Sequence, residues 1–96
     1  MKVLSISIAA YNVAYTLKEC LDPFLKSNVL GELDIMVVDD GSSDNTAEIA
    51  EEYHALYPDT FRLIKKENGG WGSTVNTGIK EAKGMYFKQL DGDDYY

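Results

Sequence analysis

The sequence predicts an α/β fold, a Rossmann-like parallel sheet of about four strands with flanking helices. Short apolar runs alternate with segments of helical periodicity along all 96 residues. The run at 35–38 is apolar at every position, which is typical of a strand buried on both faces. Polar or glycine-rich residues follow each run at once, and in a parallel sheet these would all lie at the carboxyl edge, where ligands bind.

Four apolar runs are the predicted strands, at 3–10, 33–38, 61–64 and 85–90. A helical segment separates each run from the next, and strands joined through helices pair in parallel. A chain of 96 residues has room for one domain at most, so the predicted unit is 1–96.

The first predicted helix follows the 3–10 strand. Its apolar stripe consists of Leu17, Cys20, Leu21, Phe24 and Leu25, at the spacing of one helix face. Pro23 interrupts the stripe, so the helix should kink or restart there. Cys20 belongs to the stripe and is interpreted as a small core residue, not a nucleophile.

The second and third helices are predicted after the next two strands. The second has a stripe of Ile49, Ala50, Tyr53, Leu56 and Tyr57, opens at the capping types of 43–45 and closes at Pro58. The third is short, with Val75, Ile79 and Ala82 on one face and Gly84 in the position after its end.

Composition excludes several classes of function. The net charge is −7, which argues against nucleic-acid binding, because such binding needs basic side chains that displace counterions. Cys20 is the only cysteine, so no intrachain disulfide can form. No apolar stretch approaches the roughly 20 residues of a membrane span, and 1–10 is interpreted as a strand, not a targeting segment. The prediction is a cytoplasmic chain, with membrane association of the whole protein left open.

Three carboxylates fall within four residues at Asp91, Asp93 and Asp94. Together they would repel one another, and a hard divalent cation such as Mn²⁺ or Mg²⁺ removes that penalty because Asp oxygens are its preferred ligands. A polar turn after a strand is the alternative interpretation.

The pair Asp39 and Asp40 also follows a predicted strand, and a carboxylate there can accept hydrogen bonds from a nucleobase or a ribose. A calcium loop starting at Asp40 is a weaker alternative, because Asn45 stands where such a loop requires glycine. Gly69, Gly70 and Gly72 would let backbone N–H groups approach an anionic ligand where a helix begins.

Taken together, these motifs resemble those of family 2 inverting glycosyltransferases of the GT-A fold. The resemblance is carried by 7–12 (SIAAYN), 37–46 (VVDDGSSDNT), 67–70 (ENGG) with 76–78 (NTG), and 84–94 (GMYFKQLDGDD). The motifs stand in family order and spacing over nearly the whole chain, which would then be the N-terminal half of a GT-A domain.

The resemblance implies a nucleotide-sugar donor, usually linked to UDP, bound at the strand ends with Mn²⁺ or Mg²⁺. By position, Ala9 and Tyr11 would line the nucleoside pocket, and Asp40 would meet the base with Asp39 beside it. Asn68 and Gly70 would border the nucleotide. Asp91 and Asp93 match the family's DxD pair, with Asp93 as the main metal ligand and Asp91 directed to the ribose or to a metal-bound water.

The resemblance also implies what 1–96 lacks. Family members continue well past the DxD motif, and the general base that deprotonates the acceptor is expected beyond residue 96. The chain is therefore predicted to be a donor-binding portion that is inactive alone. Its acceptor is unknown, with a growing glycan or a lipid-linked sugar as candidates, and uncovered sheet edge should favour self-association.

Two other functions are compatible with the sequence. A nucleotidyltransferase that makes nucleotide sugars shares the general architecture, but it would normally carry a glycine-rich basic loop where this chain has 11–14 (YNVA). A binding or interaction module could keep the fold without chemistry. Nucleotide binding that depends on a metal would distinguish the glycosyltransferase prediction from that module.

Overall fold

The structure, a computed structural model, describes residues 3–26 and 30–91. Its elements in chain order are β1 (Leu4–Ala10), α1 (Ala14–Leu25), the short 3₁₀ turn η1 (Leu30–Glu32), β2 (Leu33–Asp40), α2 (Thr46–Leu56), β3 (Phe61–Lys66), α3 (Trp71–Glu81) and β4 (Tyr86–Asp91). The four predicted strands are confirmed, with ends that differ by one or two residues from those read in the sequence.

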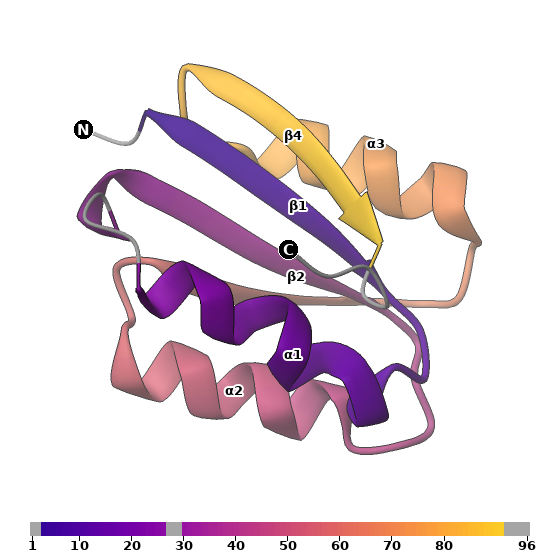
Figure 1. The fold of residues 1–96 in the computed structure, drawn as a ribbon. Coiled ribbons are helices and arrows are strands. Elements are labelled where there is room, and N and C mark those ends of the chain that lie inside the picture. The colour runs from indigo at the N-terminus through magenta and orange to yellow at the C-terminus, as the bar shows by residue number, and fades with distance from the viewer. Residues whose placement is uncertain (1–2, 27–29, 92–96) are drawn as a thin grey trace.

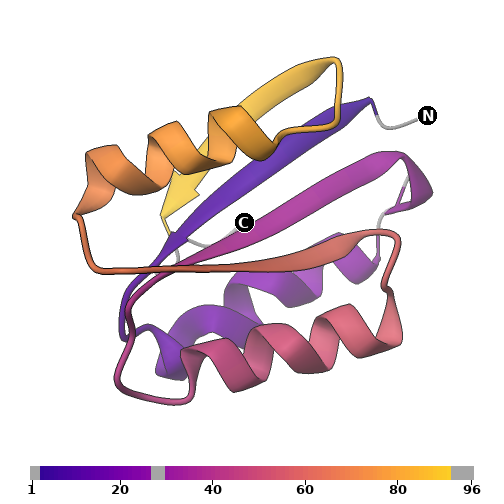
Figure 2. The same cartoon turned by 180° about the vertical axis from the view of Figure 1, so that it is seen from behind.

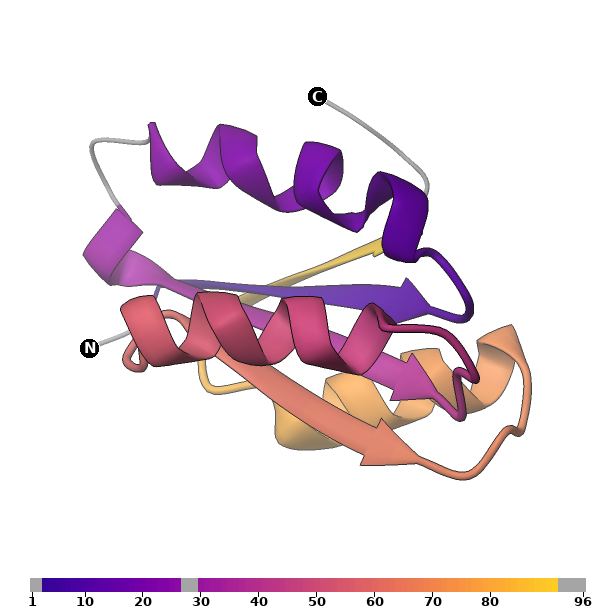
Figure 3. The same cartoon turned by 90° about the horizontal axis from the view of Figure 1, so that it is seen from below.

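The strands form one parallel sheet in the order β3-β2-β1-β4, and their arrows point the same way in Figure 3. The chain runs outward from β1 through β2 to β3 and then crosses back to place β4 on the other side of β1. The connections therefore change direction between β1 and β4, and a crevice beyond the carboxyl ends of such strands is where open α/β sheets bind ligands.

Two layers of helix cover the sheet. Helices α1 and α2 lie on one face and α3 lies on the opposite face, as Figures 1 and 2 show from the two sides. Strand β2 is buried along its whole length, as its unbroken apolar run predicted. The main core lies under α1 and α2, and its fully enclosed side chains include Ile8, Leu17, Leu21, Ile35, Val37 and Phe61.

Helix α1 differs from the prediction at Pro23. The helix continues through Pro23 and ends at Leu25, so the expected restart is wrong. Proline removes only one backbone hydrogen bond so close to a helix end. The buried stripe, which includes Leu17 and Leu21 at 0% exposure, holds the rest of α1 on the sheet.

Two apolar stripes were assigned too broadly. In α2 the side chain of Leu56 is 72% exposed, and Tyr57, just past the helix end, is also exposed. In α3 the buried residues are Thr74 and Gly78, whereas Ile79 is exposed. Helix α3 is therefore longer than predicted and faces the sheet with small side chains.

Gly78 explains how α3 approaches the sheet so closely. A Cβ atom at this position would lie 2.1 Å from Ser7 Oγ and 2.6 Å from Ser7 Cβ on β1. The helix ends at Glu81, and its C-cap Ala82 is extended. The prediction that Gly84 is the first residue beyond the cap is therefore wrong. Instead, Gly84 N–H donates to Ser5 Oγ at 2.7 Å and ties the chain to β1.

A buried polar network closes the amino edge of the sheet. The Asp34 carboxylate, 2% exposed, accepts from Arg62 Nε at 2.8 Å, Arg62 Nη2 at 3.0 Å, Ser5 Oγ at 2.8 Å and Lys83 N–H at 3.1 Å. Burial alone would raise the pKa of Asp34, but these hydrogen bonds and the Arg62 charge outweigh it and hold the pKa below 3.8. The network therefore joins β1, β2, β3 and the end of α3.

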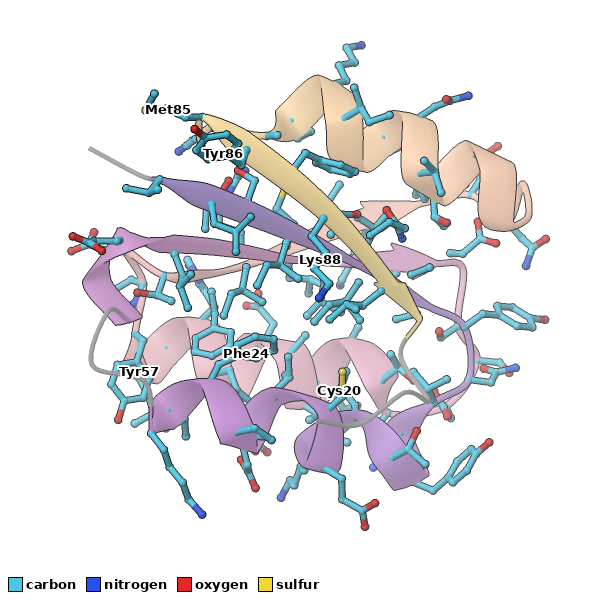
Figure 4. The ribbon with its side chains drawn as sticks, turned by 45° about the horizontal axis from the view of Figure 1, so that its top comes forward. Cys20, Phe24, Tyr57, Met85, Tyr86 and Lys88 are labelled. Carbon is cyan, nitrogen blue, oxygen red and sulfur yellow. The ribbon has the colours of Figure 1, made fainter. Side chains whose placement is uncertain are left out.

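Strand β4 has an open side in the described part of the chain. A groove of about 220 Å³ between α1 and β4 is lined by Leu4, Ile6, Phe24, Lys88 and Leu90. In Figure 4 Phe24 reaches toward it from α1 and Lys88 from β4, while Met85 and Tyr86 are exposed at the start of the strand. Self-association through this side stays a prediction. Among the described helices, none has the length and apolarity to cross a membrane.

Candidate functional site

Asn12 interlocks the turns that follow β1 and β2. Its Oδ1 accepts from the N–H groups of Ser43 at 2.8 Å and Asp44 at 3.4 Å, and its own N–H donates to Ser42 Oγ at 2.9 Å. Asn12 has a φ of +52°, a left-handed conformation that asparagine tolerates better than most residues. The ends of β1 and β2 are thus held in a fixed relation.

Asp44 joins the beginnings of two helices. Its Oδ2 accepts from Ala14 N–H at 3.2 Å in α1, and its Oδ1 accepts from Thr46 N–H at 3.0 Å in α2. Thr46 Oγ1 in turn accepts from Val13 N–H at 3.0 Å. Burial alone would raise the pKa of Asp44, but the hydrogen bonds from Thr46 and Ala14 outweigh it and lower the pKa below 3.8. A negative charge at two helix N-termini also suits their dipoles.

Asp40 is the most extensively hydrogen-bonded of the predicted site residues. Its Oδ1 accepts from Lys66 Nζ at 2.6 Å and Gly69 N–H at 2.8 Å, and its Oδ2 accepts from Gly70 N–H at 3.0 Å. Its backbone carbonyl accepts from Asn68 Nδ2 at 3.0 Å. Burial alone would raise the pKa of Asp40, but these donors and the Lys66 charge outweigh it and hold the pKa below 3.8. The carboxylate is therefore ionised at neutral pH and acts only as an acceptor.

Asp39 lies beside Asp40 in sequence but belongs to the other face of the sheet, because neighbouring strand residues point to opposite faces. Its Oδ1 accepts from Ser42 N–H at 3.1 Å, which shapes the turn after β2. The two adjacent acids therefore do not share one pocket. Asp39 is 5% exposed and Asp40 4%.

The other predicted residues lie at the same carboxyl edge. Ala9 is buried near the end of β1, and Tyr11 just beyond it is 52% exposed. Asp91, the last residue of β4, is the register partner of Ala9, so the ends of β1 and β4 are adjacent. Asp93 lies outside the described residues.

Gly70 directly precedes α3 and has a φ of +85°, which a residue with a side chain rarely adopts. The conformation directs its N–H to Asp40 Oδ2 and turns the chain from β3 into the helix. Gly70 thus binds the Asp40 carboxylate and Asn68 the Asp40 backbone carbonyl, and their contact with a nucleotide stays a prediction.

A metal ion needs several acidic, imidazole or thiolate side chains that converge on one point. Within 3–26 and 30–91, no group of three or more His, Cys, Asp or Glu side chains is arranged as a metal site. Asp40 and Asp44, which the calcium-loop alternative would need together, are bound to different backbone and side-chain donors. The described residues therefore give no support to that alternative.

Two contributors to the site were missed in the sequence. Lys66 ends β3 in register with Asp40, a contact across 26 residues that only strand pairing reveals. Asn12 was noted as a motif residue, but not as the acceptor that joins two turns. The position of Asn12 between a predicted strand and a predicted helix is the pattern that indicates such a turn-forming asparagine.

Comparison with known proteins gives consistent matches. Residues 5–96 match the family model of Glycosyl transferase family 2. An uncharacterized glycosyltransferase, EpsJ, from Bacillus subtilis (strain 168) is 43% identical over 93 residues, which are 97% of this chain and 26% of that protein. The chain thus spans about a quarter of the length of EpsJ.

Solved structures share the fold. S. aureus TarS 1–349 in complex with UDP matches with a TM-score of 0.86 and 30% identity over 99% of this chain and 28% of that one. The mannosyltransferase PcManGT from Pyrobaculum calidifontis, in complex with GDP-Man and Mn²⁺, matches with a TM-score of 0.87 and 25% identity over 97% of this chain and 28% of that one. The predicted GT-A architecture is confirmed by these likenesses.

Proposed function

The chain belongs to glycosyl transferase family 2, and from that premise we propose that it is the donor-binding portion of a metal-dependent glycosyltransferase. The whole protein would transfer a sugar from a nucleotide-sugar, with a UDP-sugar as the first candidate, to an acceptor such as a growing glycan or a lipid-linked sugar. The proposed unit is 1–96, in a cytoplasmic setting.

One observation carries this proposal. The segments after β1, β2 and β3 meet at one edge of the sheet through hydrogen bonds of Asn12 and Asp40, next to the point between β1 and β4 where the connections change direction. The carboxyl edge at such a switch point is the usual ligand site of an open α/β sheet. Asp40 contributes an ionised carboxylate to this edge.

Asp40 supports a particular class of nucleotide. An ionised carboxylate can only accept hydrogen bonds, so its partner on a base must be an N–H group. Uracil and guanine present a ring N–H to such an acceptor, whereas cytosine offers only its exocyclic amino group and places an acceptor ring nitrogen beside it. The two structural neighbours were solved with UDP and with GDP-Man, whose bases both belong to the first kind. UDP is preferred here because the UDP-bound neighbour is the more similar in sequence.

Each proposed residue has a distinct part in donor binding. Ala9 leaves room for the nucleoside beside β1, and Tyr11 offers an exposed ring for stacking. Asp40 receives the base N–H, with Asp39 shaping the turn beside it, and Asn68 and Gly70 border the nucleotide.

Asp93 and Asp91 are the proposed ligands of Mn²⁺ or Mg²⁺. Carboxylates suit such hard cations, and the PcManGT structure contains Mn²⁺. When bound, the ion would supply positive charge that stabilises the departing nucleoside diphosphate. The base that deprotonates the acceptor is proposed to lie beyond residue 96.

Calorimetric titration of UDP, with and without Mn²⁺, tests the proposal. UDP should bind, and Mn²⁺ should strengthen the binding. Asp40→Ala should weaken UDP binding about 10- to 100-fold even without metal, because a hydrogen bond to a charged group is lost. Asp93→Ala should abolish the Mn²⁺ effect and leave metal-free binding unchanged.

Asp59→Ala is the matched control, since Asp59 is an exposed acid outside the site. It should bind UDP like the parent. If the folded parent binds neither UDP nor GDP, the donor-binding role is wrong and an interaction module becomes the better explanation. If it binds UTP with Mn²⁺ far more tightly than UDP, a nucleotidyltransferase is favoured.

A further inference from the structure

Lys66 is an almost enclosed cation next to the proposed base site. Its side chain is 15% exposed, and its Nζ lies 2.6 Å from Asp40 Oδ1 across the β2–β3 pair. Lys65, the preceding residue, is exposed on the opposite face of the strand. Two neighbouring lysines of equal charge therefore have different surroundings.

Lys66 also supports the turn that leads into α3. Its Nζ donates to the backbone carbonyl of Glu67 at 2.6 Å, and a Cβ atom built on Gly69 would lie 3.1 Å from that Nζ. The N–H groups of Gly69 and Gly70 donate to the same carboxylate that Lys66 binds. Lys66, the Asp40 carboxylate and the turn at 67–70 are thus joined to one another by hydrogen bonds.

These hydrogen bonds fix the orientation of the Asp40 carboxylate and its remaining capacity to accept hydrogen bonds. Oδ1 has two donors, whereas Oδ2 has one donor among the described residues. Since each carboxylate oxygen can accept about two hydrogen bonds, Oδ2 keeps capacity for one further donor. Lys66 also neutralises a charge that would otherwise be costly to bury beside an incoming nucleotide.

We infer that Lys66 is a positioning residue for nucleobase selection: it holds the Asp40 carboxylate so that the free acceptor on Oδ2 meets a base with a ring N–H, as in uracil, and discriminates against cytosine. This inference rests on the proposed donor-binding function. Lys66 acts through Asp40 and the glycine turn, and it needs no contact with the nucleotide.

The test compares UDP with CDP, two nucleotides that differ in the base edge and share the diphosphate. Both are titrated into the full-length protein and its Lys66→Met, Lys66→Arg and Lys65→Met variants. The parent should prefer UDP. Lys66→Met should weaken UDP binding by about tenfold and CDP binding much less, so that the preference for UDP collapses.

Lys66→Arg keeps a donor cation and should restore most of the preference, while Lys65→Met should match the parent. A lysine with a merely structural role would change affinity for both nucleotides together, or only the unfolding temperature, which is measured for each variant. An unchanged UDP-to-CDP ratio in a folded Lys66→Met variant would overturn the inference. So would equal binding of UDP and CDP by the parent. Absence of binding of any nucleotide by the parent would instead overturn the proposed function.

Discussion

Replacing Arg62 by methionine should strongly destabilise the fold through Asp34. The substitution removes two hydrogen bonds of 2.8 and 3.0 Å from a carboxylate that is 2% exposed, and a third bond of 2.6 Å to the Glu81 carbonyl. Breaking one side of a buried ion pair costs about 3 to 5 kcal/mol, because the remaining charge stays buried. We expect about 3 kcal/mol here, since Arg62 is 20% exposed and Ser5 and Lys83 still donate to Asp34.

The measurement is urea unfolding of the chain and of Arg62→Met, with thermal unfolding alongside. For a chain of this size, a loss of 3 kcal/mol corresponds to a fall in melting temperature of about 12 to 24 °C. Lys18→Met removes an exposed cation from α1 and is the control. It should change the free energy of unfolding by less than about 0.5 kcal/mol.

The pH dependence gives a second, independent check. The pKa of Asp34 lies below 3.8 in the folded chain, so its ionised form stabilises the fold above that pH and the stabilisation is lost as the pH falls through the folded value. Without Arg62, burial should raise the pKa of Asp34 toward or above 3.8. The stability gap between parent and variant should therefore be constant from pH 7 to about pH 5 and shrink below it. A gap under about 1 kcal/mol at pH 7, or one unchanged at pH 3, would refute the reasoning.

Two further substitutions test close contacts. Gly78→Ala should lower the free energy of unfolding by about 1 to 3 kcal/mol, because its Cβ would overlap Ser7, and Ser7→Gly in the double variant should recover part of the loss in urea unfolding. A loss that Ser7→Gly leaves unchanged would contradict this account. Asn12→Ala should destabilise more than Asn12→Gly by about 1 kcal/mol, since both lose the acceptor for Ser43 but only alanine is strained at a φ of +52°. Equal melting temperatures for the two Asn12 variants would show that the left-handed conformation contributes nothing.

The fold could be predicted because most of its signal is local. Strand β2 is buried on both faces, so its apolar run was unambiguous, and the helices between strands required a parallel sheet. Helix α3 was harder, because its buried residues are the small Thr74 and Gly78, with Gly78 against Ser7 of β1, and not a stripe of large apolar residues. Hydrophobic periodicity does not detect a helix that approaches its sheet through small residues.

The candidate site could be proposed from the sequence, but its internal contacts could not. The carboxyl edge followed from polar residues at successive strand ends, which needs only topology. The partner of Asp40 depends on which residue of β3 stands opposite, and Lys65 and Lys66 are equivalent until the register is known. Asp34 was overlooked for a related reason: it stands inside an apolar run, and only the structure brings Arg62 to it.

Asp34 and Asp40 stand on the same strand, and each binds a cation from β3, yet their hydrogen bonding differs. Four donors reach the Asp34 carboxylate, one at Oδ1 and three at Oδ2, and they come from the amino edge of the sheet, opposite the edge where α/β sheets bind ligands. Among the described residues three donors reach the Asp40 carboxylate, and the unused position is on Oδ2, at the edge where β1 and α3 also direct polar groups. Donors from β1, β3 and the end of α3 suit a carboxylate that stabilises the amino edge. A position at the carboxyl edge, with an acceptor on Oδ2 held in place by a lysine, suits a carboxylate that binds a base, and this difference in location supports different roles for the two pairs.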